Sequence, residues 1–316
     1  MLFFKRNKIP YYIKNYLSYF LPNILYVNRL KKVLSAFDAI EDKTYINDRL
    51  DYYFKEQKSF TTDEKSESIS HFYKNHKKNT YFFDSISYLR AFELNRKFNY
   101  VFGDVTHVPG IPSFVKSRPI SGRNENSVLL KLNKIRHYFF INDKKKYTDK
   151  KDILVWRGEA RGKPHRTEFL KKLWNHPMCD VGQTQKPEED VPWQKPKLNI
   201  PQQLDFKFIF CLEGNDVATN IKWVMSSNSL AFSHKMKYET WYMEGRLQPG
   251  YHFVLIKDDL SDLEEKMNYY SENVKEAQEI IKNAHNWVEQ FSDEKREDII
   301  SFLVIKKYFE LQEKRQ

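Results

Sequence analysis

The stretch Phe206-Lys207-Phe208-Ile209-Phe210-Cys211-Leu212-Glu213-Gly214-Asn215-Asp216 decides the fold that we predict from the sequence. It begins with an apolar run typical of a buried strand, which Gly214 then interrupts. Apolar residues return at helical spacing at Val217, Ile221 and Val224. In the order strand, turn, helix, the free N–H groups at the helix start point toward the carboxyl end of the strand, where a phosphate group is stabilised.

The same order of elements recurs on both sides of this stretch. Apolar runs that predict strands occupy residues 152–156 and 251–256, a short apolar segment occupies residues 229–232, and a helical pattern occupies residues 167–174. The chain after residue 260 carries apolar stripes at helical spacing. Strands alternating with helices predict an α/β fold with a parallel sheet, in which ligands collect at the carboxyl ends of the strands.

The first half of the chain gives weaker patterns. They predict helices at residues 44–58, 85–92 and 126–132, strands at residues 81–83, 99–104 and 135–141, and an irregular, proline-containing segment at residues 105–125. Asp84 is expected to cap the helix that begins at Ser85. The lysine-rich tract 142–151 is the best candidate for a linker between two domains.

These patterns predict an N-terminal domain over residues 1–145, a second α/β domain over residues 146–292 and a terminal helix over residues 293–316 that crosses back to the first domain. With 41% apolar residues, 24 Phe and 20 Tyr in 316 residues, the chain can bury substantial cores. Cys179 and Cys211 are too far apart in sequence for a metal knuckle or redox pair. They are expected to be core thiols of a protein in a reducing cytoplasm.

The positive charge of the chain is unevenly placed. A formal net charge of +11 predicts anionic partners, such as nucleic acid, membrane lipid or a phosphorylated substrate. The first acidic residue is Asp38, and basic and aromatic residues are interleaved before it. This N-terminal segment lacks the apolar core of a secretory signal and the apolar length of a membrane span. It predicts an amphipathic helix that packs on the first domain, lies on a membrane surface, or does both.

Three blocks of sequence, at residues 212–217, 229–232 and 248–263, resemble in order the conserved region of glycosyltransferase family 90. The resemblance extends over residues 150–290 and is to the bacterial lipopolysaccharide-core branch in particular. It implies a GT-B-like α/β fold of two facing Rossmann-like domains with a C-terminal helical segment. It also implies inverting transfer of a sugar from a nucleotide diphosphate, expected to be UDP, to a lipopolysaccharide-core or other surface glycan.

The segment from Arg157 to Arg166 is expected to hold the diphosphate of the donor. Arginine's planar fork matches paired phosphate oxygens, although an exposed basic turn is the ordinary explanation for such a run. The end of the segment, Pro164-His165-Arg166, resembles the family's arginine-glycine element, which ends in Pro-x-Arg. The resemblance therefore implies Arg166 as the principal diphosphate contact, with Arg157 and Arg161 next and Gly158 beside them.

Gly214 and Asn215 form the second half of the expected donor site. In eukaryotic members of the family an arginine lies on the helix after this glycine, and that position falls on Asn220 here, while Lys222 falls on a basic position. Lys222 would then supply a less directional charge, or would be an exposed lysine of a surface helix. Enzymes of this type also place a ribose-binding acid in the loop before the second strand, which would be Glu239.

A general base is expected from the first domain. The irregular segment offers Asp104 and Glu125, since a carboxylate in a partly dry cleft can take the proton of an acceptor hydroxyl. Neither matches the family's aspartate, and each is also explained as a turn acid or an acid at a helix start. Asp180 is a candidate near the nucleotide, but a turn-forming aspartate is the preferred explanation.

The nine histidines show no metal-binding spacing, and no Asp-x-Asp element lies between apolar runs. We therefore expect a transferase without a metal or other cofactor. Its expected partners are a UDP-sugar, a lipid-linked glycan acceptor and the anionic inner face of the plasma membrane, to which a cytoplasmic protein would bind peripherally; nucleic acid is not expected. The alternative is a basic nucleic-acid-binding protein without catalytic activity. A sugar phosphotransferase is disfavoured because no Gly-Lys-Ser/Thr loop is present.

Overall fold

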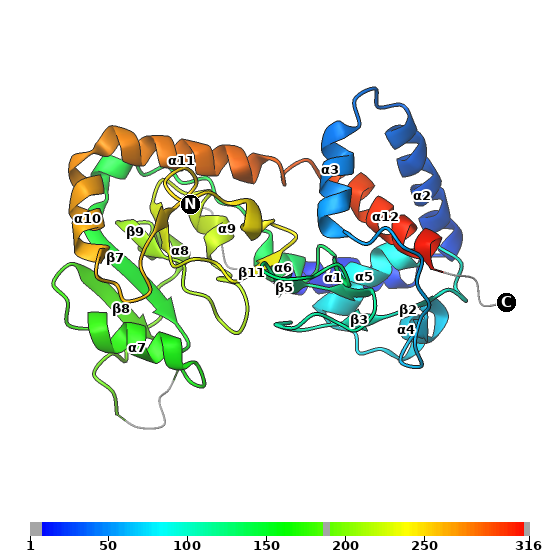
Figure 1. Cartoon of the computed structure of the whole chain (residues 1–316), viewed down its shortest axis with the longest axis horizontal. Helices are drawn as coiled ribbons and strands as arrows, with labels where there is room; N and C mark the ends of the chain where they lie inside the picture. Colours follow the sequence, from blue (N-terminus) through cyan, green and yellow to red (C-terminus); the bar gives the residue numbers. More distant parts are fainter. Residues whose placement is uncertain (1–7, 186–189, 313–316) are drawn as a thin grey trace. The chain divides into compact units, whose positions relative to one another are not determined.

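The computed structural model describes residues 8–185 and 190–312 (Figure 1). The chain divides into two compact units. Unit 1 is formed by residues 1–137, 237–243 and 291–316, and unit 2 by residues 138–236 and 244–290. Neither unit is a single stretch of sequence. Both contain helices and parallel strands, so the predicted α/β class is confirmed.

Unit 2 is built around a parallel sheet, which in the described part of the chain has five strands (Figure 1). In spatial order these are β12 (Val254–Leu255), β10 (Leu230–Ser233), β9 (Phe206–Phe210), β7 (Lys151–Gly158) and β8 (Cys179–Gln183). Numbered along the chain from the β8 edge, the order is 2-1-3-4-5, that of a doubly wound α/β sheet. The parallel sheet expected around residues 206–212 is therefore present.

Both faces of this sheet are buried, as a parallel sheet requires. Leu154 is in register with Phe208, and both belong to a buried cluster that includes apolar side chains of α7, α10 and α11. Val155 and Ile209, the next pair in register, are also buried. The helical elements of unit 2 are α7 (Pro164–Leu173), α8 (Ile200–Gln203), α9 (Ile221–Val224), α10 (Leu263–Glu272), α11 (Val274–Glu289), η1 (Tyr147–Asp149) and η2 (Glu244–Arg246).

Unit 1 is mainly helical, with short strands. Its helices are α1 (Lys8–Tyr19), α2 (Asn23–Asp38), α3 (Thr44–Tyr53), α4 (Ile69–Asn75), α5 (Thr80–Leu89), α6 (Lys134–His137) and α12 (Glu294–Leu311). Its strands are β1 (Glu67–Ser68), β2 (Lys97–Phe98), β3 (Tyr100–Val101), β4 (Ser113–Val115), β5 (Ser117–Pro119), β6 (Ser127–Leu129) and β11 (Tyr238–Thr240). Strands β3, β4 and β6 form a parallel sheet, while β5 pairs with β11 and β1 with β2 antiparallel. Helix α12 packs against α2, α3 and α5 (Figure 1).

Three predicted elements of unit 1 are wrong. Residues 81–83 lie inside α5 rather than in a strand, because Asn79 caps that helix by accepting a hydrogen bond from the backbone N–H of Phe82 at 2.9 Å. The helix predicted at residues 126–132 is replaced by β6, whose side chains are all buried between neighbouring elements. The strand predicted at residues 135–141 is replaced by the single turn of α6.

Asp84 caps a different helix from the one predicted. Its Oδ2 accepts a hydrogen bond from the backbone N–H of Lys134, at the start of α6, at 2.8 Å. Its Oδ1 accepts a hydrogen bond from the Tyr11 hydroxyl of α1, also at 2.8 Å. Burial raises the pKa of Asp84 above its ordinary value. This carboxyl group therefore ties α1, α5 and α6 together.

Two further segments also differ from the predictions. Residues 238–241 were expected to form a loop, but β11 occupies most of them and pairs with β5 inside unit 1. The tract 142–151, the expected linker, packs on unit 2, where Lys150 Nζ lies 2.8 Å from Asp143 Oδ2 and both side chains are buried. No helix among the described residues is long and apolar enough to cross a membrane.

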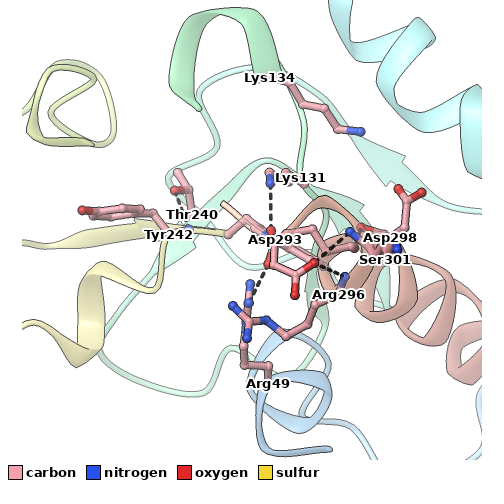
Figure 2. A network of polar contacts seen from close by, with 12 residues as sticks. Arg49, Lys131, Lys134, Thr240, Tyr242, Asp293, Arg296, Asp298 and Ser301 are labelled. Carbon is pink, nitrogen blue, oxygen red and sulfur yellow. Dashed lines mark hydrogen bonds and ion pairs between the residues drawn. The ribbon is translucent and has the colours of Figure 1, made fainter. Parts of the chain in front are cut away.

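A buried ionic cluster joins α12 to the rest of unit 1. Arg49 Nη1 of α3 lies 2.5 Å from Glu297 Oε1, and Lys131 Nζ lies 2.8 Å from Glu297 Oε2. The indole Nε1 of Trp241 donates a hydrogen bond to the same Oε2 at 2.7 Å. Figure 2 shows Arg49 and Lys131 extending from different segments toward α12. Burial raises the pKa of Glu297, but the charges of Lys131 and Arg49 lower it more, so the pKa lies below its ordinary value.

Replacing Glu297 with glutamine should destabilise unit 1 strongly. The substitution leaves the buried Arg49 and the partly buried Lys131 without a countercharge, which costs about 3–5 kcal/mol when one partner of a buried ion pair is lost. Because the folded pKa is lowered, the stabilisation by Glu297 is full above its ordinary value of 4.5 and is lost as the pH falls through the folded pKa. Denaturant unfolding at neutral and acidic pH measures both effects. Glu294→Gln, at an exposed position of the same helix, is the control, and equal losses in the two variants would contradict the prediction.

Candidate functional site

Most of the predicted ligand-binding residues lie around the carboxyl ends of β7 and β9. These strands are neighbours in the sheet but are not consecutive in the chain. At such a switch point the following loops leave the sheet in different directions, and ligands of doubly wound folds bind there. The loop after β7, residues 159–163, leads into α7, and the loop after β9, residues 211–220, leads into α9.

Arg166 connects these two loops. It lies in the first turn of α7, which begins at Pro164. Its Nε donates a hydrogen bond to the carbonyl oxygen of Glu213 at 2.8 Å, and its Nη2 donates to that of Leu212 at 2.9 Å. Its Nη1 donates to the carbonyl oxygen of Glu159, in the other loop, at 2.8 Å. One guanidinium group therefore fixes both loops at the carboxyl edge of the sheet.

A glycine and a tryptophan lie next to this guanidinium group, and a second glycine lies against the tryptophan. Nη2 of Arg166 lies 3.4 Å from the position that a Cβ atom on Gly214 would take, so the guanidinium group lies directly beside this glycine. Arg166 Cζ lies 5.4 Å from the ring centroid of Trp156, within the range of a cation–π contact. A Cβ atom on Gly158 would come within 2.5 Å of the Trp156 ring. Trp156 thus contacts both Gly158 and Arg166, and Arg166 in turn lies beside Gly214.

Arg157 is held by β8 instead. Its Nη2 donates hydrogen bonds to both carboxylate oxygens of Asp180, at 2.8 and 2.9 Å. Nη1 donates to the carbonyl oxygens of Asp180 and Trp156 at 2.6 and 3.0 Å, and Nε donates to that of Pro196 at 3.2 Å. These contacts use all five N–H donors of an arginine side chain. In this structure Arg157 therefore fastens β8 to β7, and a direct contact with a ligand would require it to give up some of these bonds.

Asp180 lies on β8, so its interpretation as a turn-forming residue is wrong. Its Oδ1 also lies 2.8 Å from Lys195 Nζ. Burial raises the pKa of Asp180, but hydrogen bonds from Lys195 and Arg157 lower it more, so the pKa lies below its ordinary value. The carboxylate acts as the centre of a structural ion cluster.

The helix expected directly after Gly214 starts later than predicted. Residues 211–220 form a loop, and the four-residue α9 begins only at Ile221. The Gly, Asn, Asp and Thr residues of this loop favour turns over helix, which explains the delay. Asn220 holds the end of the loop, since its Nδ2 donates a hydrogen bond to the carbonyl oxygen of Phe210 at 3.0 Å. The helix predicted from Val217 therefore begins four residues later, at Ile221, and the polar loop itself faces Arg166.

The other predicted residues of unit 2 differ in exposure. Lys222 is fully buried, and its Nζ lies 2.6 Å from Glu244 Oε1, whose side chain is also buried. The expectation of an exposed helix lysine is therefore wrong, and its charge is balanced inside the unit. Arg161 and Asn215 are exposed, in the turn before α7 and in the loop after β9 respectively. Their proposed contacts with a donor stay predictions.

The two candidate bases lie on turns of unit 1. Asp104 follows β3, and its Oδ1 lies 2.6 Å from the Nζ of Lys116, whose side chain is buried. This ion pair stabilises the charged form of the carboxylate. Glu125 is half-buried in the turn before β6. Both positions agree with the alternative that these acidic residues belong to turns. The catalytic role of each stays a prediction.

Glu239 lies in unit 1, on β11, with 1% of its surface exposed. Its Oε1 accepts a hydrogen bond from Arg118 Nε at 2.7 Å, and its Oε2 accepts one from the Tyr52 hydroxyl. Arg118 is itself fully buried and donates to the carbonyl oxygens of Tyr52 and Ser127 at 2.7 and 3.0 Å. The carboxylate predicted to bind ribose is thus engaged in a buried ion pair of unit 1.

Sequence reasoning missed the groups that orient Arg166. The carbonyl oxygens of the two loops leave no signature, because any residue supplies one. His165 was also missed as a partner, although its Nε2 lies 3.0 Å from the carbonyl oxygen of Glu213. One sequence signal was available. In Trp156-Arg157-Gly158 the glycine lies two residues after a large ring, on the same face of the strand, which is typical of a place where another group approaches the backbone closely. In the described residues, no group of three or more His, Cys, Asp or Glu side chains is placed to hold a metal ion.

Comparison with known proteins gives three findings. A sequence model of the family described as glycosyl transferase family 90 matches residues 129–315. The chain is 40% identical over 309 residues to O-glucosyltransferase LpsA of Dichelobacter nodosus, an alignment that covers 97% of this chain and 96% of that protein. It is 31% identical over 166 residues to protein O-glucosyltransferase 3 of Homo sapiens, which covers 49% of this chain and 32% of that protein.

The contacts of Arg157 and Arg161 predict different effects on folding. Arg157→Ala removes the partner of a partly buried carboxylate and the bonds that join β8 to β7, which should cost about 2–4 kcal/mol of unfolding free energy. Arg161→Ala, at an exposed turn, should leave stability within about 0.5 kcal/mol. Denaturant unfolding without any ligand separates the two. An Arg157→Ala protein as stable as the parent would show that the Asp180 contacts do not hold the sheet edge.

Proposed function

The chain belongs to glycosyltransferase family 90 and is a glycosyltransferase, and we propose that it transfers glucose from UDP-glucose to a lipopolysaccharide-core or other surface glycan. The names of the relatives as O-glucosyltransferases support glucose as the sugar. The resemblance of the blocks at residues 212–217 and 248–263 to the bacterial branch supports the acceptor. The proposal includes inversion at the anomeric carbon and independence of a metal ion.

The observation that carries the proposal is the position of Arg166. Its guanidinium group lies at the switch point of a doubly wound sheet, beside Gly214 and in the first turn of α7. The positive end of the α7 dipole and the arginine charge act at the same edge. A leaving diphosphate gains negative charge as the glycosidic bond breaks, and cations fixed in advance stabilise that charge without reorganising. We assign the diphosphate to this edge, with the exposed Arg161 as a second cation.

The reaction we propose is a single displacement. A base takes the proton of the acceptor hydroxyl, the acceptor oxygen attacks the anomeric carbon, and the bond to the diphosphate breaks on the opposite side. Asp104 and Glu125 are the proposed candidates for the base. A GT-B architecture belongs to the same proposal, supported by the doubly wound sheet of unit 2. So does a peripheral position on the cytoplasmic face of the plasma membrane, where a lipid-linked acceptor would be met.

UDP and UDP-glucose should raise the melting temperature of the protein. A ligand that binds only the folded state stabilises it by about 2.7 kcal/mol at one hundred times its Kd. Arg166→Ala should weaken this binding roughly 10- to 100-fold, because it removes hydrogen bonds from a charged group. Arg166→Lys should give an intermediate loss of UDP affinity, since lysine keeps the positive charge but lacks the planar guanidinium group and its paired N–H donors. Thermal-shift titration with UDP, UDP-glucose, ADP and GDP-mannose measures the effect, with and without EDTA.

Two controls keep this test decisive. Lys171→Ala changes an exposed cation at the far end of α7 and should leave UDP binding unchanged. Because Arg166 also holds two loops, circular dichroism and unliganded melting must show that the Arg166 variants are folded. The donor proposal fails if no uridine nucleotide shifts the melting temperature of the parent, or if folded Arg166→Ala binds UDP as the parent does.

One of the two acids should control the chemical step. Asp104→Asn and Glu125→Gln are expected to differ: the variant that removes the base should lower the turnover rate by about 100- to 10,000-fold while UDP binding is retained. The other variant should keep a near-normal rate. Turnover is measured across pH, because loss of the base also removes the acidic limb of the rate profile. Near-normal rates in both variants would exclude both residues as the base.

A further inference from the structure

One face of α1 is fixed to unit 1 by tyrosines. The hydroxyl of Tyr11 donates a hydrogen bond to the buried Asp84 at 2.8 Å. Tyr19 stacks on Tyr73 with ring centroids 4.5 Å apart, and the Tyr73 hydroxyl donates to the carbonyl oxygen of Tyr19 at 2.8 Å. Tyr12 packs edge-on against Phe83. These contacts set the rotation of the helix about its own axis and so decide which residues it turns outward.

The outward face of α1 is apolar and continues into the start of α2. We call this surface the apolar strip, which consists of Ile9, Ile13, Tyr16, Leu17, Phe20, Leu21, Ile24 and Leu25. The residues of α1 in it recur at helical spacing, and Leu17 and Phe20 are 68% and 77% exposed. Among the described residues, eight of the thirteen exposed large hydrophobic side chains belong to the strip. Such a concentration marks an interaction surface rather than scattered surface residues.

The charges around the apolar strip have one sign. Lys8 and Lys14 of α1 and Lys31 and Lys32 of α2 are exposed. No acidic residue precedes Asp38, although 42 Asp and Glu occur in the chain. An apolar stripe bordered by lysines complements a surface that is apolar inside and anionic outside.

We propose that the apolar strip docks the enzyme onto an anionic phospholipid bilayer, with α1 lying in the interface plane. The twelve residues of α1 are too few to cross a bilayer, which needs about 20 apolar residues. A helix that is apolar on one face and basic at its borders instead inserts that face at the headgroup boundary. This inference deepens the proposed function, from which it takes the expectation of a lipid-linked acceptor. The experiment therefore measures bilayer binding separately from donor binding.

Co-sedimentation of the full chain with lipid vesicles tests this docking surface. The parent should bind vesicles of phosphatidylcholine with phosphatidylglycerol, and bind vesicles of phosphatidylcholine alone much more weakly. Leu17→Glu with Phe20→Glu should weaken binding on the order of 100-fold, because two inserted apolar side chains are replaced by charges that the lipid repels. Leu94→Glu, at another exposed leucine of unit 1, is the matched control and should bind as the parent does.

The lysines are tested apart from the apolar residues. Lys14→Glu and Lys31→Glu should each weaken binding to the anionic vesicles at least about fivefold, the effect of losing one cation near an anionic membrane. All variants should keep the thermal shift with UDP, so failure of docking and failure of donor binding are distinguishable. The proposal is overturned if the parent does not sediment with anionic vesicles, or if the double variant binds them as tightly as Leu94→Glu. It is also overturned if the double variant converts a dimer to a monomer, since a second copy would then cover the strip.

Discussion

The guanidinium group of Arg166 holds the carboxyl edge of the unit 2 sheet together. It donates to backbone carbonyl oxygens on the loops after β7 and β9, strands that are neighbours in space but separated in the chain. Gly214 lies beside it, and Trp156 packs against it. The contacts that position the loops therefore also fix a cation at the place where a doubly wound sheet binds its ligand. An anion that enters this edge meets a charge that is already oriented, which is the condition for electrostatic stabilisation of a leaving group.

Charged residues also have a structural role in the interiors of both units. Lys222 and Glu244 form a buried pair in unit 2, and Arg118 and Glu239 form one in unit 1. Such pairs add little net stability compared with apolar packing, but losing one partner is costly. They therefore specify which segments meet more than they strengthen the fold. Of the charged residues predicted to bind the donor, Lys222 and Glu239 proved to be members of such pairs.

How far the sequence predicts the structure differs between the two units. Three strands of unit 2 lie in apolar runs, such as residues 206–212, and these runs predicted β7, β9 and β12. Strands β3, β4 and β6 of unit 1 are two or three residues long, too short for any period to show, so their formation depends on tertiary pairing. For that reason the segment that forms β6 was predicted as a helix.

The residues of the candidate site could likewise be predicted only in part. The proximity of Gly158, Arg166 and Gly214 follows from strand order and turn chemistry, both of which leave local signals. The partner of a charged side chain leaves none: Glu239 binds Arg118, which is 121 positions away in the chain. Sequence shows that a residue carries a charge, whereas only the fold shows whether that charge is already neutralised.

The division of unit 1 into separate stretches has a consequence for biosynthesis. Its ionic cluster draws Arg49 and Lys131 from the N-terminal stretch, Trp241 from the short middle stretch and Glu297 from the last. A ribosome delivers these groups in that order, and the countercharge arrives last. Unit 2, whose residues lie between Tyr138 and Gln290, is complete before α12 is made. Arg49 and Lys131 therefore lack the countercharge of Glu297 until α12 has been synthesised, and the ionic cluster of unit 1 can form only then.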